Sequence, residues 1–182
     1  MKVSKEIDSS CPVPILDPPG TADGAAMWRI ARDTGVLDLN SSYSYLLWCR
    51  DFSRTSVVAR DALGHPIGFI TGYVRPEHPQ TLVVWQVAVD HAHRGHGLAG
   101  RMLDRLAVRG MAAGTRQVET TVTPGNEPSH RLFASFAGRH GARVEREVLF
   151  GRDLFPKDHE HEPEILYRIA PLACAAPKDV SE

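Results

Sequence analysis

The sequence has few cysteines and no closely spaced cysteine pair. Its 182 residues include Cys11, Cys49 and Cys174, which lie far apart and form no CxxC motif. An odd number at these spacings predicts neither a disulfide framework nor a cysteine-ligated zinc site. We therefore expect free thiols in a reducing compartment and a cytoplasmic protein.

Long apolar runs and an excess of positive charge are also missing. No stretch approaches the ~20 apolar residues that a membrane-spanning helix needs, and the opening MKVSKEIDSS lacks the apolar core of a secretory signal peptide. The 21 Lys and Arg residues against 22 Asp and Glu give a formal net charge of -1. Such a chain lacks the basic surplus that binds phosphate backbones, so we expect no membrane and no nucleic acid as partner.

The remaining composition is that of an ordinary globular protein, with 42% hydrophobic and 24% charged residues. The length predicts one domain with a continuous core. Four prolines in residues 1–20 predict an extended or disordered arm, and residues 171–182 read as a loose tail rich in Ala and Pro. The domain itself is expected over residues 21–170.

Helical and strand patterns alternate within this domain. Thr21 is the expected N-cap of the first helix and Gly35 its stop, and Asn126 the N-cap of the last, which carries Pro128 in its first turn. Helices are predicted over 21–34 and 44–52, and from 98 and 127, and strands over 55–60, 66–74, 81–89, 117–123, 143–150 and 164–169. This order predicts an α/β layered protein with a mixed sheet.

A glycine-rich loop, RGHGLAG at residues 94–100, follows a buried strand and opens a helix. Glycines allow a ligand to approach the backbone, and the N–H groups of a helix start attract anions, so the loop predicts a phosphate site. Two templates fit. Gly95, Gly97 and Gly100 match G-x-G-x-x-G, with Glu119 about 20 residues later as in a dinucleotide fold. Residues 90–94 intervene between strand and loop, however, which disfavours that template.

The second template, R-x-x-G-x-A, belongs to a longer match. The segment VAVDHAHRGHGLAGRML resembles the acetyl-coenzyme A motif of the Gcn5-related N-acetyltransferase superfamily. Blocks outside it (LDLNSSYSYLL, FITGYVRP, ETTVTPGNEPSHRLFASFA and HEPE–LYRI) resemble the subfamily that acetylates L-2,4-diaminobutyrate in ectoine biosynthesis. The resemblance implies the superfamily's α/β fold, a mixed central sheet with a splayed strand pair and helices on both faces, and a homodimer.

The resemblance also implies how acetyl-CoA, the co-substrate, binds. The loop amides would hold its pyrophosphate, the splayed strand would offer backbone groups to the thioester, and a second helix would begin near Asn126. The implied cofactor-binding residues are Val87, Ala88, Val89, Arg94, Gly95, His96, Gly97, Leu98, Ala99, Gly100, Asn126, Ser129 and Phe133. Phe133 stands where many members have a tyrosine that protonates the departing thiolate, which leaves the general acid unassigned.

Diaminobutyrate carries two ammonium groups and a carboxylate, so a selective site needs carboxylates, an aromatic wall and a hydrogen-bond donor. The implied substrate-binding residues are Asp38, Asn40, Tyr43, Trp85 and Glu164. Plainer interpretations are also open: Asp38 could cap the next helical turn, Trp85 could belong to the core, and Glu164 could lie in a solvated loop. His159 and His161 alternate with Glu160 and Glu162, but spacing places no third ligand, so we expect no metal.

The implied chemistry is direct attack of a neutral amine on the thioester carbonyl, which requires a base. Candidate bases are Glu164, His161 and Glu119, in that order. The backbone N–H of Val87 or Ala88 could stabilise the oxyanion. No cysteine has a convincing partner base, so none is expected as a nucleophile.

Three other functions stay open on the sequence. The first is an acetyltransferase for another small amine, such as a polyamine or an aminoglycoside. The second is a coenzyme A-binding module without turnover. This alternative stays open because Phe133 replaces the tyrosine that acts as general acid in many members of the superfamily. The third is a dinucleotide-binding oxidoreductase, which rests on the glycine pattern alone.

Overall fold

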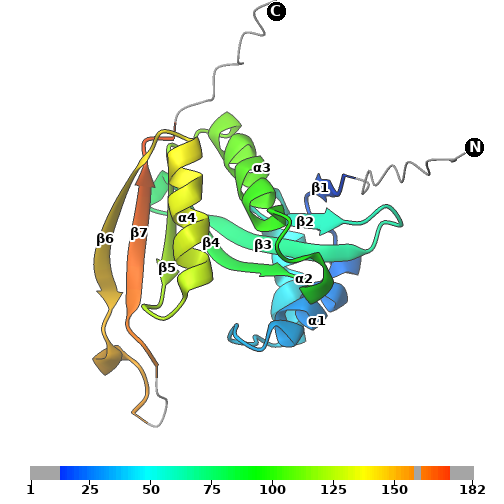
Figure 1. The fold of residues 1–182 in the computed structure, drawn as a ribbon, viewed down its shortest axis with the longest axis horizontal. Helices are drawn as coiled ribbons and strands as arrows, with labels where there is room; N and C mark the ends of the chain where they lie inside the picture. The colour runs from blue at the N-terminus through cyan, green and yellow to red at the C-terminus, as the bar shows by residue number, and fades with distance from the viewer. Residues whose placement is uncertain (1–12, 158–160, 173–182) are drawn as a thin grey trace, which may run out of the picture.

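The computed structural model describes residues 13–157 and 161–172, and it has one mixed sheet with helices on both faces (Figure 1). The strand order is β1-β2-β3-β4-β5-β7-β6. The strands are β1 (Ile15–Asp17), β2 (Val57–Arg60), β3 (Pro66–Arg75), β4 (His78–Val89), β5 (Gln117–Val122), β6 (Arg143–Phe150) and β7 (Glu164–Ala170). All neighbouring strands are antiparallel except β4 and β5.

The helices divide between the two faces of the sheet. They are α1 (Gly24–Thr34), α2 (Ser42–Asp51), α3 (Leu98–Ala112) and α4 (Glu127–Arg139). α3 and α4 lie in front of the sheet in Figure 1 and pack with it into the larger apolar core. α1 and α2 pack against the opposite face, where Phe69 and Ala88 join their apolar side chains in a second core. The predicted α/β fold with helices on both faces is confirmed.

The predicted elements are present, with ends shifted by a few residues. Gly35 ends α1 with φ 66°, as expected of a glycine C-cap. Thr21 is not an N-cap, because it begins a 3₁₀ turn (Thr21–Asp23) that precedes α1. The carboxylate of Asp23 instead accepts a hydrogen bond of 2.7 Å from the Gly20 N–H. Asn126 caps α4 as predicted, since its side chain accepts from the Ser129 N–H.

Both predicted flanking segments reach into the domain. Ile15–Asp17, within the predicted arm, pairs with β2 at the edge of the sheet. Leu172, within the predicted tail, is buried, and its N–H donates to the Arg116 carbonyl. The rest of those two segments, residues 1–12 and 173–182, lies outside the described residues. Among the helices that the structure describes, none is long and apolar enough to cross a membrane.

Candidate active site

The loop between β4 and α3 opens onto a cleft of about 700 Å³, which we call the arginine cleft. Gly95 and Gly97 have φ values of 83° and 70°, a region that residues with a Cβ rarely adopt. A Cβ on either would meet no atom within 4 Å, so free space lies beside their backbone. The first N–H groups of α3 are therefore accessible to an anion.

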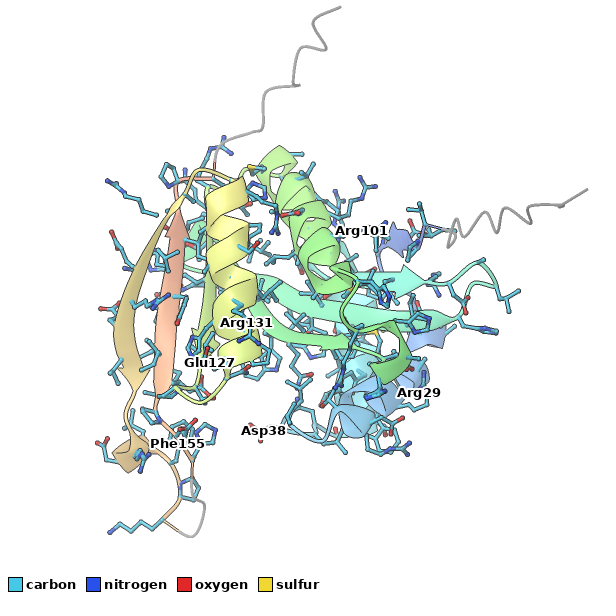
Figure 2. The ribbon with its side chains drawn as sticks, in the orientation of Figure 1. Arg29, Asp38, Arg101, Glu127, Arg131 and Phe155 are labelled. Carbon is cyan, nitrogen blue, oxygen red and sulfur yellow. The ribbon has the colours of Figure 1, made fainter. Side chains whose placement is uncertain are left out.

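The arginine cleft is strongly basic. Its lining includes four arginines from the loop, α3 and α4: Arg94, Arg101, Arg131 and Arg139. Figure 2 labels Arg101 and Arg131, which come from α3 and α4 respectively. The acid that lines the cleft, Asp104, already accepts from Arg139 Nε at 3.0 Å. The cleft is therefore suited to a ligand that carries several phosphates.

Next to this cleft, the parallel pair β4–β5 separates partway along its length. The two strands pair only from Thr81 with Gln117 to Val83 with Glu119, although β4 continues to Val89 and β5 to Val122. Beyond Val83, backbone groups on the β5 side of β4 have no strand partner. The predicted splayed strand pair is therefore present.

Alternation along β4 decides which amides face this gap. The Asp90 N–H donates to Ile67 on β3 at 2.9 Å, whereas the Val89 carbonyl faces away and accepts from Arg94 Nε at 3.0 Å. Because successive residues of a strand point to opposite sides, Ala88 faces β3 and Val87 faces the gap. Of the two amides predicted for an oxyanion, only that of Val87 is placed for it. The prediction for Ala88 is corrected on this ground.

Asp90 anchors the glycine loop to α1. Its carboxylate accepts from Arg29 Nη1 on α1 at 3.1 Å and from the Ala92 N–H at 3.3 Å. Burial by itself favours the neutral carboxyl, but these hydrogen bonds outweigh it and lower the pKa of Asp90. The charged carboxylate thus fixes the loop where the strand ends.

A second cavity, which we call the splay pocket, lies on the α1–α2 side of the sheet and measures about 550 Å³. Five segments line it: the α1–α2 link, the second half of β4, the end of β5, the β5–α4 turn, and the β6–β7 connection with the strand ends beside it. Figure 2 labels Asp38 of the link and Phe155 of the β6–β7 connection, both of which line the pocket. The pocket includes five of the residues predicted for substrate binding or catalysis: Asp38, Asn40, Trp85, His161 and Glu164.

His161 stands between two carboxylates in the splay pocket. Its Nε2 lies 3.8 Å from Asp38 Oδ2 and 3.8 Å from Glu164 Oε1, and its ring stacks on Phe155 with 3.9 Å between centroids. Its Nδ1 lies 2.6 Å from the Glu162 carbonyl oxygen. A carbonyl only accepts, so Nδ1 carries the proton of the neutral ring. The Nε2 lone pair therefore faces the two carboxylates.

The α1–α2 link is held in place by Gln86, a residue that sequence reasoning missed. Gln86 is buried, its Nε2 donates to the Asp38 carbonyl at 3.0 Å, and its Oε1 accepts from the Tyr45 hydroxyl at 3.0 Å. Burial raises the pKa of Tyr45, although hydrogen bonds with Gln86 and Asn40 oppose this effect, so Tyr45 stays a donor. Asp38 owes its position to this contact with β4, not to capping: its side chain is 94% exposed and α2 begins after Ser41.

Trp85 reaches the splay pocket because β4 is irregular there. Thr71 pairs with Gln86 and Gly72 pairs with Val84, which leaves Trp85 as the extra residue of a β-bulge. The bulge turns the indole outward: it is 56% exposed and lies 6.4 Å from the Trp48 ring. The alternative that Trp85 is a core residue is therefore wrong.

Glu119, the third candidate base, lies elsewhere. It is only 4% exposed. Its carboxylate contacts Arg75 Nη1 at 3.0 Å and Arg168 Nε at 3.1 Å. It does not line the splay pocket. Two guanidiniums already occupy this carboxylate, so it is neither a base for a bound amine nor free for a ribose.

Several other predicted residues differ in their surroundings. Asn126 caps α4 and lines the splay pocket, and the Ser129 N–H is held by that cap. Phe133 is 2% exposed within the core, where it packs. Tyr43 lies on α2, 64% exposed and outside the lining of the splay pocket, and His96 is exposed and outside the lining of the arginine cleft.

The described residues contain no group of three or more His, Cys, Asp or Glu side chains that could hold a metal ion. His159 and Glu160 lie outside them. Cys49 is buried, and burial raises the pKa of its thiol to about 11, which keeps it protonated and a poor nucleophile.

A splayed strand pair, a glycine loop at a helix start and a basic cleft beside an acidic pocket together define a coenzyme A-dependent acyltransferase fold. The model of the acetyltransferase (GNAT) family matches residues 25–138. The chain belongs to this family.

Within the family, the chain is similar to a particular group of enzymes. A relative named L-2,4-diaminobutyric acid acetyltransferase from Streptomyces avermitilis is 64% identical over 159 residues, covering 87% of this chain and 88% of the relative. One of the same name from Nocardia farcinica is 50% identical, covering 87% and 81%. The structure of diaminobutyrate acetyltransferase EctA from Paenibacillus lautus, in complex with L-2,4-diaminobutyric acid and coenzyme A, matches with a TM-score of 0.83 at 39% identity, covering 90% and 98%.

Proposed function

We propose that this protein transfers the acetyl group of acetyl-CoA to the γ-amine of L-2,4-diaminobutyrate. The product is N4-acetyl-L-2,4-diaminobutyrate, which is cyclised to ectoine. The relatives at up to 64% identity support this substrate, because the similarity extends over 87% of this chain and not only over the coenzyme motif.

The splay pocket fits a small diamine acid. Asp38 and Glu164 present two negative charges to two ammonium groups, and Trp85 presents an aromatic surface that suits a cation. Asn40 offers an amide to the substrate carboxylate. A polyamine lacks that carboxylate, which gives the pocket a basis for selectivity.

His161 is the base that the geometry supports best. The observation that carries the proposal is that its Nδ1 is held by the Glu162 carbonyl while its Nε2 lies near two carboxylates. The Glu162 carbonyl holds the Nδ1 proton, so Nε2 is free to accept a proton from the γ-ammonium. Asp38 and Glu164, each 3.8 Å away, then stabilise the imidazolium that forms. Glu164, the first candidate from the sequence, is more effective in this arrangement as a partner of the substrate and of His161.

Acetyl transfer then needs few groups of the protein. The deprotonated amine attacks the thioester carbonyl carbon, so that a C–N bond forms and the C–S bond breaks. The Val87 N–H, which faces the gap between β4 and β5, is placed to donate to the carbonyl oxygen as it gains negative charge. Phe133 is buried and has no acidic proton, so the thiolate receives its proton from another donor.

The test is a thiol-release assay with acetyl-CoA and L-2,4-diaminobutyrate, run on the wild type and on His161→Gly. Removal of a general base typically costs about 10²–10⁴-fold in rate, so we expect a loss of this size in kcat. Added imidazole should restore part of it, because it can occupy the space of the missing ring. The KM for acetyl-CoA should stay within about threefold, since His161 does not line the arginine cleft.

The same assay separates the alternatives. Higher kcat/KM with a polyamine or an aminoglycoside than with diaminobutyrate would replace the proposed substrate. Coenzyme A binding without thiol release from any amine would indicate a module without turnover. A loss in His161→Gly that imidazole does not restore would remove His161 from the role of base.

We also propose that the protein works in the cytoplasm and as a homodimer. The edge strand β6 supports an interface, because it ends in three consecutive apolar residues that are exposed. The exposed fractions of Val148, Leu149 and Phe150 are 63%, 41% and 45%. Light scattering coupled to gel filtration should give about twice the chain mass of 20.0 kDa. A mass of one chain at micromolar concentration would remove the homodimer.

A further inference from the structure

The turn between β5 and α4, residues 123–126, borders both cavities. Thr123 and Asn126 line the splay pocket, and Pro128 and Arg131, in the first turns of α4, line the arginine cleft. A displacement of this turn would therefore alter both cavities together.

One side chain ties this turn to the β6–β7 connection, which carries the proposed base. The Gly125 N–H donates to Glu162 Oε2 at 3.1 Å. A Cβ at position 125 would lie 3.2 Å from the same oxygen, so a glycine leaves more room for this contact than a residue with a side chain would. Glu162 also holds the His161 ring through its own carbonyl and lies two residues before Glu164.

A second tie reaches the same turn from β7. His130 Nε2 lies 3.0 Å from the Pro124 carbonyl, which only accepts, so this nitrogen carries the proton. The His130 Nδ1 therefore accepts from the buried Tyr167 hydroxyl, 2.5 Å away. The turn is thus held twice by residues 162–167, the segment that also supplies Glu164.

We propose that Glu162 is a positioning residue that couples the two ligand sites. Coenzyme A in the arginine cleft fixes the start of α4 and the turn before it. Through the Gly125–Glu162 hydrogen bond, the fixed turn also holds His161 and Glu164 in place. Diaminobutyrate therefore binds more tightly to the coenzyme complex than to the free protein. The coupling is reciprocal, as any binding linkage must be. This inference rests on the proposed function for its two ligands.

Calorimetry with coenzyme A and L-2,4-diaminobutyrate tests the coupling without turnover, because no acetyl group is present. For the wild type we expect diaminobutyrate to bind at least about fivefold more tightly when coenzyme A is saturating, the lower end of typical coupling. Glu162→Ala should bring this ratio close to one, whereas Glu162→Gln should keep it, since an amide oxygen still accepts from Gly125.

Glu127→Ala is the matched control: it removes an acid from the start of α4 that is 70% exposed and whose ion pair among the described residues is with Arg131, at 3.8 Å. It should keep the wild-type ratio. A wild-type ratio in Glu162→Ala would overturn the inference. So would a Glu162→Ala variant that weakens diaminobutyrate equally with and without coenzyme A, since Glu162 would then bind substrate directly. If the wild type binds coenzyme A but not diaminobutyrate, the proposed function fails instead.

Discussion

At the residue scale, two carboxylates of the splay pocket differ in how far water screens them. The Glu164 side chain is 20% exposed and that of Asp38 is 94% exposed, although both lie 3.8 Å from His161. A charge contact that is screened by water contributes little, typically below about 1 kcal/mol. The two acids should therefore contribute unequally to substrate binding, which residue type alone does not indicate.

Neutral variants of the two acids make this difference measurable. Glu164→Gln should lose about a hundredfold in kcat/KM for diaminobutyrate, because a charged contact worth a few kcal/mol is removed. Asp38→Asn should lose less than about tenfold. Steady-state kinetics on both variants, with the KM for acetyl-CoA as control, decide the question. Equal losses would mean that Asp38 becomes buried when substrate binds.

At the element scale, the start of α3 depends on glycines whose backbone leaves the right-handed region. Gly97 has φ 70° and Gly141, after α4, has φ 60°, and neither has an atom within 4 Å of an added Cβ. Their backbone demands are thus alike, but only Gly97 lines the arginine cleft. The pair separates strain in the backbone from obstruction of a ligand.

Gly97→Val should abolish coenzyme A binding, whereas Gly141→Val should bind it with wild-type affinity. Both should lose stability by a similar amount, on the order of 1–2 kcal/mol, because a residue with a Cβ is strained at positive φ. Calorimetry gives the affinity, and thermal unfolding followed by circular dichroism gives the stability. Wild-type coenzyme A affinity in a folded Gly97→Val protein would show that the loop does not hold the phosphates.

At the scale of the whole molecule, a buried acid joins three strands of the sheet. Glu119 on β5 contacts Arg75 on β3 and Arg168 on β7. These three charged residues thus link strands on both sides of the gap between β4 and β5. Removal of one partner from a buried ion pair typically costs about 3–5 kcal/mol. The two guanidiniums are 39% and 34% exposed, so water recovers part of that cost.

We expect Glu119→Ala to lower the free energy of unfolding by about 2 kcal/mol and to leave kcat/KM within about threefold. Glu145→Ala is its control, because Glu145 is 69% exposed and contacts Arg168 at 3.5 Å; it should change stability by less than about 0.5 kcal/mol. Urea unfolding and the thiol-release assay measure both quantities. A loss of turnover in folded Glu119→Ala would return this residue to the list of bases.

Local patterns in the sequence were enough to predict the features that depend on neighbouring residues. The glycine loop before α3, the Asn126 cap of α4 and the apolar strand that becomes β4 are local patterns, because caps and positive φ are satisfied within a few residues. The resemblance added the family and part of the lining of both cavities, but neither Gln86 nor the arginines of α3 and α4.

Tertiary structure decided which of the candidate groups act together. Asp38, His161 and Glu164 meet only because Gln86 holds the α1–α2 link on β4 and the β6–β7 connection returns to the same edge. Trp85 faces the pocket because a bulge turns it outward, and Glu119 is excluded because two arginines from distant strands enclose it. The charge and tautomer of such groups depend on neighbours far along the chain, and a single sequence does not specify those distances.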